Sequence, residues 1–175
     1  MRKLSNRYVT GIGALILFLI TGSVLFAGCN SNQIVLENDY FKYVISGNGT
    51  NLQFIDKATG KNYLDTKVGT KCASVSVDGS EHPASAVTFE DRQLHIAFGK
   101  TGVSIQLDVN QSGDRITLKV ASVAGKIESL TFMNVPLKLE GQPYEPFAAC
   151  VLSMNLFTHV RQLPPLQTHL WAKCY

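Results

Sequence analysis

The stretch that decides the fold is Val103-Ser-Ile-Gln-Leu-Asp-Val109, followed by Ser112-Gly-Asp114 and then Ile116-Thr-Leu-Lys-Val-Ala-Ser-Val123. Apolar and polar residues alternate in both long runs, which is typical of a β-strand with one buried face. The glycine between two polar residues suits a tight turn. The three pieces therefore predict an antiparallel hairpin.

Similar sequence patterns occur on both sides of this hairpin. Further short apolar or alternating runs occupy residues 34–36, 40–45, 52–55, 73–77, 87–89, 94–98 and 130–135. Turn-forming Gly, Asn or Asp residues separate them, and no amphipathic helix follows the amino-terminal segment. We predict an all-β fold, an antiparallel β-sandwich or half-open barrel of about nine strands. The missing crossover helices exclude a parallel α/β fold.

Residues 1–28 are predicted to be a signal peptide of the lipoprotein type. Three basic residues and no acidic ones precede an uncharged run over 8–28. Ala27 and Gly28 stand before Cys29, an arrangement that resembles the lipobox of bacterial lipoproteins, in which the cysteine is acylated. The alternatives are simple cleavage near Ala27 and an uncleaved membrane anchor, because the run is long enough to span a bilayer of about 30 Å. All three place the body outside the cytoplasm, and the first makes it a membrane-anchored lipoprotein lipidated at Cys29.

Charge is scarce and balanced in the rest of the chain. The protein has 16 basic and 13 acidic residues, and three of the basic ones lie before Cys29, so 16 − 3 = 13 remain against 13 acids. A neutral body without a basic cluster argues against nucleic acid as a partner, since phosphate binding needs a concentrated basic face.

The cysteines and sequons add little to the predicted location. Cys72, Cys150 and Cys174 are an odd number once Cys29 is acylated. They predict either one disulfide and one free thiol or, as we favour, three buried small apolar residues. Asn48 and Asn110 begin glycosylation sequons, and behind a bacterial-type leader we interpret both as turn residues.

The predicted domain plan is a short linker over 29–32, a β-sandwich body over 33–140 and a carboxy-terminal segment over 141–175. Apolar and polar residues do not clearly alternate in this last segment, as they would in a strand, and it is richer in apolar residues than an exposed tail should be. It is expected to pack either on the sandwich or on a neighbouring domain that the chain does not include.

Four stretches resemble a known family: residues 37–46, 51–64, 134–141 and 145–150. They are similar to the amino-terminal β-sandwich, of galactose-mutarotase-like supersandwich type, of large secreted glycoside-hydrolase-like bacterial proteins. The resemblance implies a sandwich, in this chain an incomplete supersandwich, that precedes a catalytic barrel carrying the acid and the nucleophile. It therefore carries over no catalytic residue.

No residue pattern predicts catalysis, a metal site or a cofactor. Glycoside hydrolysis needs two carboxyl groups facing each other across a cleft, whereas the acids lie mainly in turns or at strand ends, with Asp108 and Glu128 predicted within strands. The histidines lack the short paired spacings of zinc sites. A mutarotase-type reaction would use a histidine as the acid and a carboxylate as the base. The parity of His95 is opposite to that of its apolar neighbours, so it should point outward.

Aromatic residues could offer a stacking platform for sugars, although no carbohydrate site can be named from the sequence. Core packing or domain contact explains most of the candidates with a polar group. These candidates are Tyr40, Tyr43, Tyr63, Tyr144, Trp171 and Tyr175.

The predicted function is that of a non-catalytic accessory domain of an exported carbohydrate-active protein. Its expected partners are the membrane, through the lipid, a carbohydrate, and a catalytic domain or partner chain. Two alternatives stay open: a free-standing surface module that binds glycan, and a mutarotase-like sugar epimerase.

Overall fold

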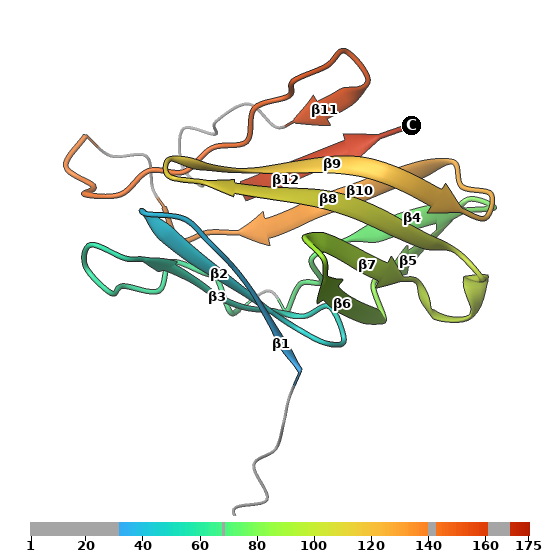
Figure 1. Ribbon diagram of the computed structural model, residues 1–175, viewed down its shortest axis with the longest axis horizontal. Helices are drawn as coiled ribbons and strands as arrows, with labels where there is room; N and C mark the ends of the chain where they lie inside the picture. The colour runs from blue at the N-terminus through green and yellow to red at the C-terminus, as the bar shows by residue number, and fades with distance from the viewer. Residues whose placement is uncertain (1–31, 68, 140–142, 161–168) are drawn as a thin grey trace, which may run out of the picture. The chain divides into compact units, whose positions relative to one another are not determined.

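The computed structural model describes residues 32–67, 69–139, 143–160 and 169–175 (Figure 1). These residues form twelve β-strands and one short 3-10 turn, with no α-helix among them. Every strand pairing is antiparallel. The prediction of an all-β antiparallel sandwich is confirmed.

The strands form three sheets that pack together. The first is a three-stranded meander of β1 (Gln33–Glu37), β2 (Phe41–Ser46) and β3 (Asn51–Asp56). Between β2 and β3 the chain turns through Gly49, which has φ +81° and whose Cβ, if present, would lie 2.8 Å from that of Ala84. Only glycine meets both demands, so the turn fixes how closely this sheet approaches its neighbours.

The second sheet joins strands from the middle of the chain to the carboxy-terminal strands. Its strand order is β11-β12-β10-β4-β5, with a register shift in the pairing of β10 with β12. Its strands are β4 (Ser74–Val77), β5 (Ser80–Pro83), β10 (Ser129–Pro136), β11 (Thr158–Val160) and β12 (His169–Cys174).

The third sheet holds the hairpin from which the fold was predicted. It runs β6 (Ala86–Glu90), β7 (Gln93–Ala97), β8 (Ser104–Ser112) and β9 (Arg115–Ala124), each paired with the next. The 3-10 turn Gly99–Thr101 joins β7 to β8. The pairing of β8 with β9 shifts between Gln106 and Leu107, where β9 contains one extra, unpaired residue.

One apolar core joins the three sheets. Leu36, Phe54, Leu107 and Leu130 are fully or almost fully buried in it, and they come from β1, β3, β8 and β10. The alternation predicted for 94–98 is confirmed, because Leu94, Ile96 and Phe98 are buried while the intervening residues are not. Hydrophobic burial on one face of each sheet therefore holds the sandwich together.

A line of polar side chains, which we call the polar seam, runs outward from this interior. Tyr43 and Asn51 are buried, and Asn134 and His169 are half-buried. The Tyr43 hydroxyl donates to Asn51 Oδ1, and Asn51 Nδ2 donates to the Asn134 carbonyl at 2.8 Å. Asn134 Nδ2 donates to the carbonyl of Lys71 at 2.9 Å, and Asn134 Oδ1 lies 2.7 Å from His169 Nε2. The seam ties β2 and β3 of the first sheet to β10 and β12 of the second.

All nine predicted strands are present, and β5, β11 and β12 were missed. β5 reads Ser-Glu-His-Pro and has no apolar alternation that could reveal it. β12 does alternate, with Leu170 and Ala172 buried, but its partner β10 lies far away in sequence. This pairing places β12 in the sandwich. Phe147 also packs there, since its ring stacks on that of Tyr63 with centroids 5.1 Å apart.

Candidate functional site

The outer face of β7, β8 and β9 carries rows of polar side chains that the strand register places side by side. One row is His95, Gln106 and Ser122, and the next is Gln93, Asp108 and Lys119, each read across the three strands. A third pair is Asn110 of β8 with Thr117 of β9. The side chains between them along the strands, such as Leu94 and Leu107, are buried on the opposite face. We call this surface the polar face.

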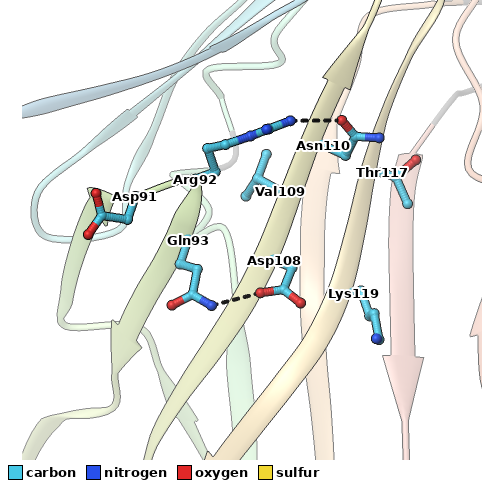
Figure 2. A pocket seen from close by; sticks show the side chains of 8 residues that line it. All are labelled: Asp91, Arg92, Gln93, Asp108, Val109, Asn110, Thr117 and Lys119. Carbon is cyan, nitrogen blue, oxygen red and sulfur yellow. Dashed lines mark hydrogen bonds between the residues drawn. The ribbon is translucent and has the colours of Figure 1, made fainter.

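A hollow of about 360 Å³ lies at one end of the polar face, beside the turn from β6 to β7. Figure 2 shows its lining side chains, which come from that turn and from β7, β8 and β9. They are Asp91, Arg92, Gln93, Asp108, Val109, Asn110, Thr117 and Lys119.

Two hydrogen bonds between neighbouring strands hold the lining in place. Gln93 Nε2 donates to Asp108 Oδ1 at 2.8 Å, and Arg92 Nη2 donates to Asn110 Oδ1 at 3.2 Å (Figure 2). Each bond uses only part of the hydrogen-bonding capacity of these groups, because a carboxylate or an amide oxygen accepts more than one bond and a guanidinium has five N–H groups. Several donors and acceptors are therefore fixed in position on an accessible surface.

The turn that carries Arg92 has an unusual backbone. Glu90 pairs with Gln93, so Asp91 and Arg92 alone form a two-residue turn, with φ of +49° and +64°. Such turns favour Asn-Gly or Asp-Gly, because a side chain at positive φ costs about 1–2 kcal/mol. Asp91 fits the preference and Arg92 does not. The arginine is held where it can reach Asn110, at the expense of local stability.

The charges of the lining cancel, because Asp91 and Asp108 are matched by Arg92 and Lys119. Figure 2 shows the Asp91 carboxylate directed away from that of Asp108. Two carboxyl groups that face each other across a cleft, as glycoside hydrolysis requires, are thus not brought together here. The arrangement can instead offer hydrogen bonds to a neutral polar ligand.

The structure places the other acidic and histidine candidates apart from the hollow. His95 lies in the polar face opposite Gln106, with the outward orientation that its parity predicted. Glu128 was predicted within a strand, and this is wrong: it lies just before β10, where the Ser76 hydroxyl and the Gly79 N–H donate to it and lower its pKa. Over the described part of the chain, no group of three His, Cys, Asp or Glu side chains could hold a metal ion.

The cysteine expectation is correct for one residue in three. Cys72 is buried, and burial raises the pKa of its thiol to about 12, so it has little thiolate with which to react. Cys150 is exposed and Cys174 is half-buried, which corrects the prediction of three buried thiols, and all three are free. Cys29, the predicted lipidation site, lies outside the described residues.

Two of the six aromatic candidates belong to the core. Tyr43 and Tyr63 are buried, so neither offers a face to a sugar. Tyr40, Tyr144 and Tyr175 are exposed and Trp171 is half-buried. None of the six lines the hollow.

The two sequons have different structural settings. Asn48 is a turn residue as predicted, and its Oδ1 accepts from the Thr50 N–H at 3.1 Å. Asn110 is not a turn residue, because it lies within β8.

Sequence reasoning missed the hollow as a site. The available signal was the presence of planar amide and carboxylate side chains at polar positions 93, 106, 108 and 110, in and beside the alternating runs. Seeing that these positions adjoin the turn at 91–92 required the register.

The described ranges include no helix that is both long enough and apolar enough to cross a bilayer. Comparison with known proteins finds no matching family model, no matching curated protein and no matching solved structure. The resemblance to the sandwich of glycoside-hydrolase-like proteins therefore stays a prediction.

Proposed function

We propose that the chain is the non-catalytic β-sandwich of an exported carbohydrate-active protein and that it contacts carbohydrate through the polar face. The observation that carries the proposal is the hollow beside the turn from β6 to β7, with Gln93, Asp108, Arg92 and Asn110 held by hydrogen bonds on its surface. A catalytic domain or partner chain would supply the chemistry.

The chemistry of the lining favours a neutral, polyhydroxylated ligand. Vicinal hydroxyl groups each donate and accept, so they match a surface on which amides, a carboxylate and a guanidinium lie side by side. The lining has two acidic and two basic residues, so it should not bind a phosphate or sulfate group in preference to a neutral one. Polarity alone would be an ordinary property of an antiparallel sheet that faces water; the hollow and the positive φ of Arg92 set this face apart.

The proposed location is the outer side of a bacterial membrane, with the mature chain beginning at an acylated Cys29. The sequence Ala27-Gly28-Cys29 after an uncharged run supports it. Mass spectrometry of membrane-extracted protein should find two or three acyl chains on Cys29. A mature chain that starts elsewhere, or processing that is unchanged in Cys29→Ala, would contradict this location.

The free-standing glycan-binding module uses the same face and differs only in lacking a catalytic neighbour. The mutarotase alternative gains no support from the geometry, because that reaction uses a histidine and a carboxylate at one sugar. No histidine lines the hollow, and His95 lies in the neighbouring row.

The test is a glycan array probed with the full-length protein, followed by titration calorimetry with the best neutral oligosaccharide. Asp108→Ala and Gln93→Ala should each weaken binding about tenfold, since each removes a hydrogen-bonding group worth about 1–1.5 kcal/mol.

Thr88→Ala is the matched control, because Thr88 is an exposed residue of the same sheet, opposite His95 and outside the hollow. It should leave binding unchanged. The proposal fails if no neutral glycan binds, or if the Asp108 and Gln93 variants bind as tightly as the unaltered protein.

A further inference from the structure

Three outward residues of β8 form a line that runs beyond the hollow. Gln106, Asp108 and Asn110 occupy every second position of the strand and alternate with buried residues, and we call them the β8 line. Asp108 and Asn110 line the hollow, whereas Gln106 lies outside it. A strand rises about 3.4 Å per residue, so the line spans about 14 Å, which is longer than a single sugar ring.

Each residue of the β8 line accepts one hydrogen bond from a neighbouring side chain of the same sheet. The Ser122 hydroxyl of β9 donates to Gln106 Oε1 at 2.9 Å. Asp108 and Asn110 accept the two bonds that are drawn in Figure 2. These bonds orient all three side chains before a ligand arrives, which lowers the entropy lost on binding.

The same bonds leave a second polar group available on each side chain. Within the described part of the chain, Gln106 Nε2, Asp108 Oδ2 and Asn110 Nδ2 make no hydrogen bond. The β8 line therefore presents a donor, an acceptor and a donor in succession. A hydroxyl group both donates and accepts, so the hydroxyls along one sugar chain can bond to all three.

The β8 line is open at its Gln106 end. The next row of outward residues is Ala97, Ser104 and Ala124, read across β7, β8 and β9. These side chains are small, so a ligand that continues past Gln106 meets no large side chain of this row. The arrangement suits a segment within a chain better than a single terminal sugar.

We infer that the β8 line binds an extended, unbranched neutral polysaccharide, with part of the chain in the hollow and a sugar further along at Gln106. The inference rests on the proposed function and specifies its ligand. Groups in a straight line along one strand match a chain with extended linkages, as in cellulose, mannan or xylan. A coiled chain, as in starch, curves away and reaches fewer of the three groups.

The test is calorimetry of the full-length protein with cello-, manno- and xylo-oligosaccharides of increasing length, and with malto-oligosaccharides as the coiled comparison. In at least one extended series, affinity should rise about tenfold between the disaccharide and the tetrasaccharide, because the longer ligand also reaches Gln106. The malto-oligosaccharides should gain less than about twofold over the same lengths.

Gln106→Ala should abolish this gain and leave the affinity for the disaccharide unchanged. Gln53→Ala is the matched control, because Gln53 is an exposed glutamine of β3 in the first sheet, and it should change neither affinity. The inference is overturned if affinity does not rise with length, if the coiled series gains as much, or if Gln106→Ala binds the tetrasaccharide as tightly as the unaltered protein. Glycan binding that still depends on Asp108 and Gln93 would in those cases leave the proposed function standing. If no neutral glycan binds, both fail.

Discussion

Asparagine occupies two contrasting regions of this molecule, the polar seam between the sheets and the polar face on the outside. Asn51 is buried, and its side chain bonds to Tyr43, Thr70 and the Asn134 carbonyl. Asn110 is exposed, and its Oδ1 accepts one bond from Arg92. The same amide thus serves the fold in one place and is available to a ligand in the other. The two settings differ in their access to water. An exposed group that loses its hydrogen-bond partner can bond to water instead, whereas a buried group cannot.

The largest effect should come from removing the amide at the centre of the polar seam. Asn51→Ala leaves the Thr70 hydroxyl, the Asn134 carbonyl and the Tyr43 hydroxyl without their partner. An unsatisfied buried group costs about 1–3 kcal/mol, and the half-buried Thr70 and Asn134 can turn to water, so the loss of unfolding free energy should be about 3 kcal/mol. Urea unfolding followed by far-UV circular dichroism measures it. A loss below about 1 kcal/mol would show that the seam contributes little to joining the sheets.

Two buried tyrosines test the value of a buried hydrogen bond, because only one of their hydroxyl groups has a hydrogen-bond partner. The Tyr43 hydroxyl donates to Asn51, whereas the Tyr63 hydroxyl is buried with no hydrogen-bond partner in the described structure. Burial raises the pKa of Tyr43, so it stays protonated as the donor at any ordinary pH.

Tyr43→Phe should therefore cost about 1.5 kcal/mol, while Tyr63→Phe should leave stability unchanged or raise it by up to about 1 kcal/mol. Both changes keep the ring and its packing, so each variant controls for the other in thermal unfolding. An equal loss in the two variants would mean that the hydrogen bond of Tyr43 has no net value.

The sequence predicted the regions of this molecule whose signal is local. The alternation in 103–109 and 116–123 identified β8 and β9, because the period is visible within a few residues. β8 buries one face, whereas the apolar residues of β9 are at most half-buried. β12 needs β10 as its partner, and the seam needs Asn51 beside Asn134, 83 positions away. The hollow needs the β7–β8–β9 register. No local pattern carries such pairings, so long-range contact set the limit of the prediction.

Acid should weaken the first sheet through Asp56, the buried carboxylate that ends β3. The Thr59 hydroxyl and the N–H groups of Ala58 and Thr59 donate to it, and they lower its pKa. A pKa that is lower in the folded state gives stability that is present above the unfolded value of about 4 and is lost as the pH falls through the folded value.

Asp56→Asn tests this, because it removes the charge and keeps the shape. The variant should be about 1 kcal/mol less stable at pH 7, and the difference should shrink as the pH falls below about 4. Thermal unfolding between pH 7 and pH 2 measures both curves. Parallel curves with a constant offset would assign the loss to shape and not to ionisation.

The smallest effect on stability belongs to the polar face, and it is the one that bears most directly on function. Asn110→Ala breaks the bond from Arg92, but both groups are exposed and water can replace it, so unfolding free energy should change by less than about 0.5 kcal/mol. Arg92→Gly should raise the free energy of unfolding by up to about 1 kcal/mol, because glycine accepts φ of +64° without strain. Both Asn110→Ala and Arg92→Gly should bind the oligosaccharide more weakly. Chemical unfolding measures the stability of each sample, and calorimetry measures its binding. A residue kept at a strained position for its side chain should lose function and gain stability when replaced. If Arg92→Gly instead destabilises the protein and leaves binding intact, Arg92 stabilises the fold. The main argument that the polar face binds a ligand then fails.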